Sequence, residues 1–169
     1  MKLQFYNEKL LDFKKYKDFM KENKDAYFCS GLFTIDKEKN ENEVHFDFYV
    51  PSSKKMFSFS LNGEIELKEL KIYDERIPEE IHTDFDIDLE DFIKTITKKM
   101  ENEGVKNSTK KFLFSFQVLE GKAFLLATIF LSNLGLLKVN ISIPKGEIVS
   151  FEKKSLGDIF KVFKKNKKE

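Results

Sequence analysis

Apolar and polar residues alternate along several stretches of the chain, and this pattern predicts β-strands. Residues 44–50 and 57–61 alternate in the first half, and residues 112–119 alternate in the second half. A period of two residues predicts antiparallel strands with one buried face. Asn62-Gly63 and Glu120-Gly121-Lys122 are typical of the tight turns that join such strands.

Residues 124–131 differ from these strands because they are apolar on both faces of the predicted strand. A strand of this kind needs cover on both of its faces. One cover is the helix of its own unit. The other is the sister unit, a third helix or a second chain, and the sequence does not choose between them.

A period of 3.6 residues predicts three helices. The first is expected to run from Asn7, as N-cap, to about Asn23. The second is expected to begin after the N-cap Asp88 and to stop at Gly104. The third follows Ser155 and presents one apolar side.

These elements occur in the same order twice along the chain. Residues 11–23 resemble residues 90–102, and residues 57–65 resemble residues 139–148. The offset between the copies grows from 79 at Phe13 and Phe92 to 83 at Gly63 and Gly146, as small loop insertions would produce. We interpret this as a duplicated α-β-β-β-β unit. The alternative interpretation is that any two units made of a helix and a meander look alike.

The predicted fold class is therefore α+β, with two tandem α-β-β-β-β units whose antiparallel sheets are covered by helices, plus a C-terminal helix. The predicted boundaries are residues 1–73 for the first unit, 74–87 for an acidic linker, and 88–169 for the second unit with its C-terminal helix and basic tail. We expect the linker to be an exposed connector. The sequence leaves open whether the two units form one sheet or two.

Charge is distributed unevenly along a chain whose net charge is only +1. Residues 1–87 carry a net charge of −5, and residues 88–169 carry +6. Two halves of opposite charge attract each other weakly and also favour association of one molecule with another. Arg76 is the single arginine, so the chain is poorly supplied for bidentate recognition of phosphate or carboxylate groups.

Other features indicate a cytoplasmic protein without a transmembrane segment. The first residues contain no apolar signal core, and the longest apolar stretch is broken by polar residues and Gly135. Cys29 is the single cysteine, which fits a reducing compartment. Because Cys29 lies in an apolar run, we expect a buried and inert thiol.

The candidate catalytic and metal-binding residues of the sequence give little support to an enzymatic function. Asp84, Asp86 and Asp88 alternate, but the positions after them do not fit a calcium loop, so a solvated linker and a helix cap are favoured. His45 lies beside Asp47 on the predicted outward strand face, where the pair could act in acid–base chemistry. Because no nucleophile motif accompanies this pair, we interpret the pair as a surface contact. We therefore predict no catalytic, cofactor-binding or metal-binding residue, and no cofactor.

The C-terminal segment is rich in lysine and supplies the only candidate partner contacts. Nucleic acid or an anionic membrane surface would attract these lysines. The favoured alternative is a solvated tail beyond a helix that caps the core, where lysine suits the negative end of the helix dipole. The candidate contact residues are Lys161, Lys164, Lys165, Lys167 and Lys168.

The end of each unit resembles the PepSY-like family, in which apolar residues alternate and a Gly-Glu-apolar sequence follows. The matching residues of the second unit are Val139, Ile141, Ile143, Gly146, Glu147, Ile148 and Val149, and those of the first are Phe57, Phe59, Leu61, Gly63, Glu64 and Ile65. The resemblance covers most of residues 8–152 and implies small non-catalytic units linked to peptidase regulation or binding. The chain also looks like uncharacterised archaeal proteins with such units.

These observations favour a non-enzymatic protein-binding or regulatory module. Its expected partner is a second copy of the chain or another protein, because the strand at 124–131 has an apolar face to cover. One alternative is a small-molecule or lipid-binding protein with an apolar cavity. The others are weak association of the Lys-rich C-terminus with nucleic acid or membrane, and an enzyme centred on His45, Asp47 and the acidic linker.

Overall fold

The computed structural model describes residues 1–72, 76–82, 87–155 and 157. Three helices and eight strands lie in this part of the chain. The helices are α1 (Leu3–Leu11), α2 (Lys14–Glu22) and α3 (Leu89–Asn102). The strands are β1 (Tyr27–Asp36), β2 (Glu41–Val50), β3 (Lys55–Ser60), β4 (Glu66–Leu70), β5 (Thr109–Leu119), β6 (Lys122–Leu131), β7 (Gly135–Ser142) and β8 (Glu147–Ser155).

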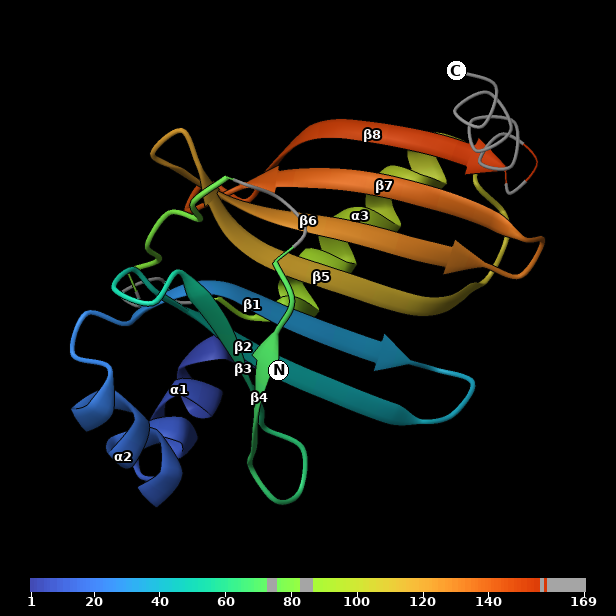
Figure 1. Ribbon diagram of the computed structural model, residues 1–169. Helices are drawn as coiled ribbons and strands as arrows, with labels where there is room; N and C mark the ends of the chain where they lie inside the picture. The colour runs from blue at the N-terminus through green and yellow to red at the C-terminus, as the bar shows by residue number, and fades with distance from the viewer. Residues whose placement is uncertain (73–75, 83–86, 156, 158–169) are drawn as a thin grey trace.

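All eight strands form one antiparallel sheet in the order β4-β3-β2-β1-β5-β6-β7-β8 (Figure 1). Each half of the chain contributes a meander of four strands. The two meanders meet where β1 pairs with β5, from Gly31 opposite Phe116 to Asp36 opposite Lys111. The question of one sheet or two is therefore answered in favour of one. Whether the two halves arose by duplication stays a prediction.

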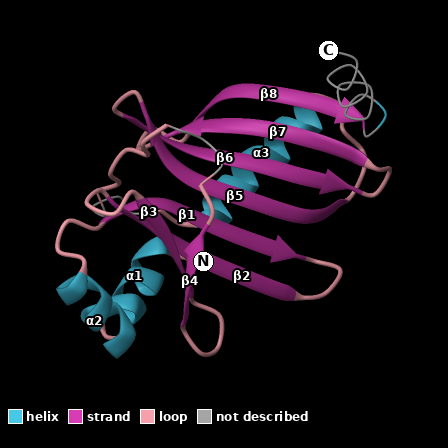
Figure 2. Ribbon diagram, in the orientation of Figure 1, coloured by secondary structure: helices cyan, strands magenta, loops and turns pink. Residues whose placement is uncertain are grey.

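The predicted fold class, α+β with helices covering the sheets, is wrong. The protein is mostly β, with 48% of its residues in strands and 22% in helices. The helices lie on one face of the sheet (Figure 2). The longest helix has 14 residues and spans about 21 Å, and eight strands spaced about 4.8 Å apart make a sheet about 34 Å wide. Because the described helices all lie on one face, they leave the other face of the sheet open.

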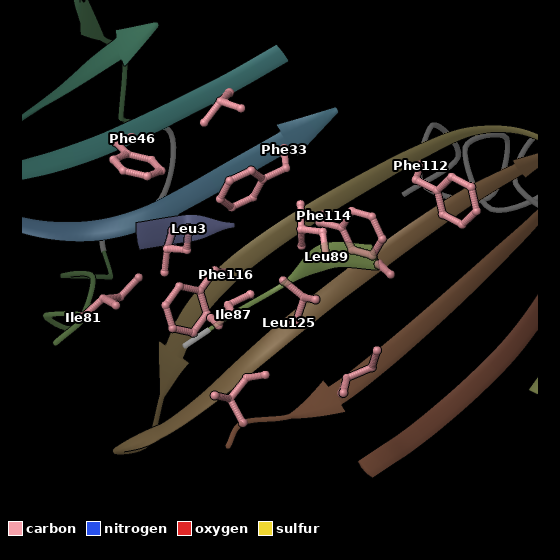
Figure 3. Close-up of a cluster of buried hydrophobic side chains, with 14 of the residues drawn as sticks. Leu3, Phe33, Phe46, Ile81, Ile87, Leu89, Phe112, Phe114, Phe116 and Leu125 are labelled. Atoms are coloured by element: carbon pink, nitrogen blue, oxygen red, sulfur yellow. The ribbon is translucent and has the colours of Figure 1, made fainter. Parts of the chain in front are cut away.

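The predicted alternation of the strands is confirmed, and it builds one core shared by both halves. On the helix side, Phe33 of β1 is paired with Phe114 of β5, and both side chains are buried. Figure 3 shows Leu3, Ile87 and Leu89 among these phenylalanines, so segments distant in sequence close the same core. The backbone binds them together, because the amide of Leu3 donates to the carbonyl of Ile87.

Of two predictions about the helices, one is wrong and the other is confirmed. The single helix expected from Asn7 to Asn23 is wrong, because α1 and α2 are separate and Phe13 between them has an extended backbone. The break lets α2 turn onto the sheet, where the ring of Phe19 packs edge-on against Phe57 and Phe59. The N-cap of α3 is confirmed, since the carboxylate of Asp88 accepts a hydrogen bond from the amide of Glu90.

The expectation of an exposed connector between the halves fits most of its described residues, since residues 76, 77, 79, 80 and 82 are exposed, but it fails at two positions. Ile81 and Ile87 are 2% and 1% exposed and belong to the core. Apolar side chains in an acidic segment bring it onto the protein, because burying each one removes it from water at a gain of about 1.5–3 kcal/mol.

Several sequence predictions fall outside the described residues. They are the helix after Ser155, the side chains of Asp84 and Asp86, and the whole basic tail. Within the part of the chain that the structure covers, no helix has the combination of length and apolar character that crossing a bilayer requires.

Candidate binding face and cleft

The face of the sheet opposite the helices, called the open face below, carries a mixture of apolar and polar side chains. Cross-strand pairing aligns one row across its centre. The row consists of His45, Leu32, Ser115, Leu126 and Asn140. Leu32 is 40% exposed, and Leu126 is half-buried. Apolar side chains that remain partly exposed in the middle of a sheet are typical of contact surfaces.

Neighbouring rows extend this surface. Leu113 is paired with Thr128, and Phe130 is paired with Leu136 on the adjoining strand. We call Leu32, Leu113, Leu126 and Phe130 the central patch. No described helix or strand packs over it, so the second cover expected for residues 124–131 is not supplied by this part of the chain.

The charges on the open face differ between its two halves. Acidic side chains occupy β1 and β2, and lysines occupy β5, β7 and β8, in the same two rows across the sheet. The acidic residues are Asp36, Glu41 and Glu43, and the lysines are Lys111, Lys138 and Lys154. Glu152 of β8 lies among these lysines, opposite Lys138 and 3.0 Å from Lys154, and Lys111 lies 3.5 Å from Asp36. The central patch therefore has a mainly acidic rim on one side and, on the other, a rim in which lysines outnumber the single acidic residue Glu152.

A short segment, residues 76–80, crosses one end of the open face, and we call it the strap. Three interactions hold it. The hydroxyl of Tyr27 donates to the carbonyl of Pro78 at 2.7 Å, and the carboxylate of Glu79 accepts from the amides of Glu120 and Gly121 at 2.6 and 2.8 Å. The strap then enters the core through Ile81, whose amide donates to the carbonyl of Phe28.

Between the strap and the sheet lies a cleft of about 940 Å³. Its walls combine apolar side chains from the strap and four strands with a few polar groups. Leu32, Met56, Ile77, Leu119 and Phe124 supply apolar surface, and Cys29, Ser30, Asp47 and Gln117 supply polar atoms. Clefts of roughly 300–1,000 Å³ with this mixture are typical of sites for small molecules.

Asp47 is the unusual polar residue of this cleft. It is 4% exposed, and cross-strand pairing places it between Ser30 on β1 and Ser58 on β3. Its Oδ1 is the one buried side-chain oxygen or nitrogen among the described residues without a hydrogen-bond partner. Burial raises the pKa of the Asp47 carboxyl, and the Ser58 hydroxyl and the charge of His45 partly oppose this rise.

Cys29 is buried, as the sequence predicts, and it lies beside Asp47. Its thiol donates to the backbone carbonyl of Asp47 at 3.4 Å. Burial, together with the nearby charge of Asp47, raises the pKa of the Cys29 thiol to about 12. At neutral pH the thiol is protonated and a poor nucleophile.

His45 and Asp47 are two residues apart on β2 and share the open face, as predicted. The interpretation of Asp47 as a surface contact is wrong, because the carboxylate is buried. His45 is half-buried, and it is not among the residues that line the cleft. The candidate contacts Lys161, Lys164, Lys165, Lys167 and Lys168 lie outside the described residues.

Sequence reasoning missed the strap and the cleft that it forms. The available signal was Ile77-Pro78, an apolar residue and a helix breaker inside an acidic segment. A second signal was the position of Asp47 between Phe46 and Phe48 and close to Tyr49, because a carboxylate among so many aromatic residues is unusual in an exposed strand.

Comparisons with known proteins add information about the fold. No family model and no curated protein matches the sequence. Among solved structures, a candidate lipoprotein from Clostridium difficile 630 is similar, with a TM-score of 0.57 and 13% sequence identity over 83% of this chain and 90% of that chain. At this identity the likeness shows a shared fold alone. The PepSY-like resemblance and the cytoplasmic location stay predictions.

Proposed function

We propose that the protein is a non-enzymatic binding module, and that it binds a protein through the open face of its sheet. The partner that the charges favour is a second copy of the same chain. The observation that carries the proposal is the central patch, whose apolar side chains remain partly exposed and uncovered by any described helix or strand.

The open face offers enough area for a stable contact. The strands have between 5 and 11 residues, so the whole face measures at most about 1,100 Å², and the strap covers one end of it. A standard interface buries about 800 Å² on each partner. Its centre is apolar and its rim is polar, which is also the arrangement of the open face.

Charge complementarity supports pairing of two copies. A two-fold axis that lies between the two sheets, parallel to their strands, would place the acidic half of one open face over the basic half of the other. Glu43 of one copy would then lie over the half that carries Lys138 in its partner. Each copy gives and receives the same attraction, as in any isologous interface.

Sedimentation equilibrium over a wide range of protein concentration tests this proposal. We expect a reversible dimer that weakens as salt is added, because the rims attract each other electrostatically. Leu126→Lys should weaken the dimer at least about tenfold by placing a charge in the apolar centre. Thr97→Lys, on an exposed position of α3 on the other face, is the matched control and should leave the dimer unchanged.

Charge reversal gives a second and more specific result. Glu43→Lys should weaken the dimer, and adding Lys138→Glu to the same chain should restore much of the loss by restoring opposite rims. A protein that stays monomeric at every concentration, or a dimer that is equally sensitive to Thr97→Lys and Leu126→Lys, would contradict the proposal.

A further inference from the structure

The cleft beneath the strap has features that pairing through the central patch does not explain. Asp47 is 4% exposed and lines this cleft, and its Oδ1 has no hydrogen-bond partner. A buried acceptor without a donor costs free energy, and an ionised one costs more than a neutral one. Buried carboxylates are therefore normally paired, and here the described residues supply no pair for Oδ1.

We propose that this cleft is a binding site for a small organic cation, namely a molecule with an ammonium group and an apolar body. The ammonium group pairs with the carboxylate of Asp47, whose Oδ1 is closed to solvent in the free protein and is reached by rotation of the side chain. The apolar body lies between the strap and the sheet. The inference goes beyond the proposed pairing of two chains, because it concerns a different ligand and the part of the open face beneath the strap, which adjoins the central patch at Leu32.

The polar groups of the cleft favour an ammonium group over a metal ion. Divalent cations require several oxygen ligands, and Ca²⁺ takes six to eight. The described residues contain no group of three or more His, Cys, Asp or Glu side chains that could hold a metal ion. Of the carboxylates that line the cleft, that of Glu79 already accepts from the amides of Glu120 and Gly121. An ammonium group needs few acceptors, and its hydrogen bond to a carboxylate is about twice as strong as one between neutral groups.

The apolar walls favour an organic cation over a bare ammonium ion. Leu32, Ile77 and Phe124 come from β1, the strap and β6 and surround the same space. A volume of about 940 Å³ is far larger than one ammonium group requires. An alkyl or aryl body would remove these side chains from water, at about 25 cal/mol for each Å² of apolar surface covered.

The charged groups around the cleft are compatible with a cation. Three carboxylates line it, from Asp47, Glu79 and Glu120, together with the cationic side chains of Arg76 and Lys122. Asp47 is the most deeply buried of these five. The cationic groups lie on more exposed residues, where solvent screens them more strongly.

Titration with 2-phenylethylammonium, followed by the amide signals of the full-length protein in NMR, tests the proposal. The neutral analogue 2-phenylethanol has nearly the same shape and tests the role of the charge. We expect saturable binding of the ammonium compound, with signals of β1, β2 and the strap shifting together. The alcohol should bind at least about tenfold more weakly.

Asp47→Asn is the decisive variant, because it keeps the shape of the side chain and removes its charge. It should weaken binding of the ammonium compound at least about tenfold and leave that of the alcohol unchanged. Glu22→Gln removes an exposed carboxylate from α2, on the other side of the sheet, and should change neither affinity. Equal affinities of the wild-type protein for the two compounds would overturn the proposal, whether or not the Asp47 variant folds. Equal affinities of the wild type and a folded Asp47→Asn variant for the ammonium compound would also overturn it.

Discussion

Asp47 shows how far the position of a single residue can be inferred from sequence. Alternation along β2 correctly assigns its side chain to the open face. Its burial was not predicted, because the strap that covers this end of the face comes from residues about thirty positions later in the chain. Period-two patterns specify which face a side chain occupies, and they contain no information about which distant segment lies over that face.

The buried carboxylate of Asp47 predicts a pH-dependent stability. Because its pKa is raised, the folded protein keeps this proton to a higher pH than the unfolded chain does. This residue's contribution to the free energy of unfolding therefore falls as pH rises from the ordinary pKa of 3.8 through the raised pKa. Asp47→Asn removes the ionisation, so the variant should gain stability relative to the wild type across this window.

Urea unfolding of both proteins between about pH 4 and pH 8 measures this difference. Glu43→Gln, which alters an exposed carboxylate on the same strand, is the control and should run parallel to the wild type. Parallel profiles for Asp47→Asn and the wild type would show that Asp47 titrates normally.

Cys29 predicts slow thiol chemistry in the folded protein. A pKa of about 12, against an ordinary value of 9.0, lowers the thiolate fraction about a thousandfold. We expect Ellman's reagent to leave the native protein almost unmodified and to react at once in urea. Rapid reaction of the native protein would mean that β1 opens readily or that the thiol is not buried.

At the scale of elements, strands were predicted more reliably than helices and connections. The alternation at residues 44–50, 57–61 and 112–119 is strong and produces β2, β3 and β5. The helix pattern did not reveal the break at Phe13, because the apolar face continues from α1 into α2. The strap lies in the segment predicted as an exposed linker, because residues 74–87 contain six carboxylates, and its attachment to the sheet was not predicted.

The attachment of the strap predicts a local effect of Glu79. Glu79→Ala removes the carboxylate that accepts from the amides of Glu120 and Gly121, which should cost about 1–1.5 kcal/mol of local stability. Exchange of these two amides with solvent should become roughly tenfold faster in hydrogen-exchange NMR. Glu80→Ala, one position along, has no such contact among the described residues and is the control. Unchanged exchange in Glu79→Ala would show that the strap is held without this carboxylate.

At the scale of the whole molecule, the decisive contact is the pairing of β1 with β5. It joins two meanders into one sheet, and both meanders share one core on the helix side. The sequence predicted the meanders because each is built from neighbouring strands. It could not predict their union, because every strand edge offers the same backbone groups and local periodicity does not identify the edge that will pair. The fold class was predicted wrongly for the same reason.

A single continuous sheet with helices on one face leaves a broad second face, and the proposed functions of the protein lie on that face. Its central patch is apolar, and its rims are oppositely charged. These properties support the proposed pairing of two copies, and the cleft under the strap is the proposed small-molecule site. The two sites lie on the same face and can be tested with separate variants.

The most direct test of the central claim is the rate at which maleimide labels a cysteine placed at Ser115. This residue lies in the row between Leu32 and Leu126, and cysteine has nearly the size of serine. If two open faces pair, labelling of the Ser115→Cys variant should slow at least about tenfold as protein concentration rises through the dimer range. Labelling of Thr97→Cys on α3 should not change. Rates that fall equally at both positions, or at neither, would contradict binding through the open face.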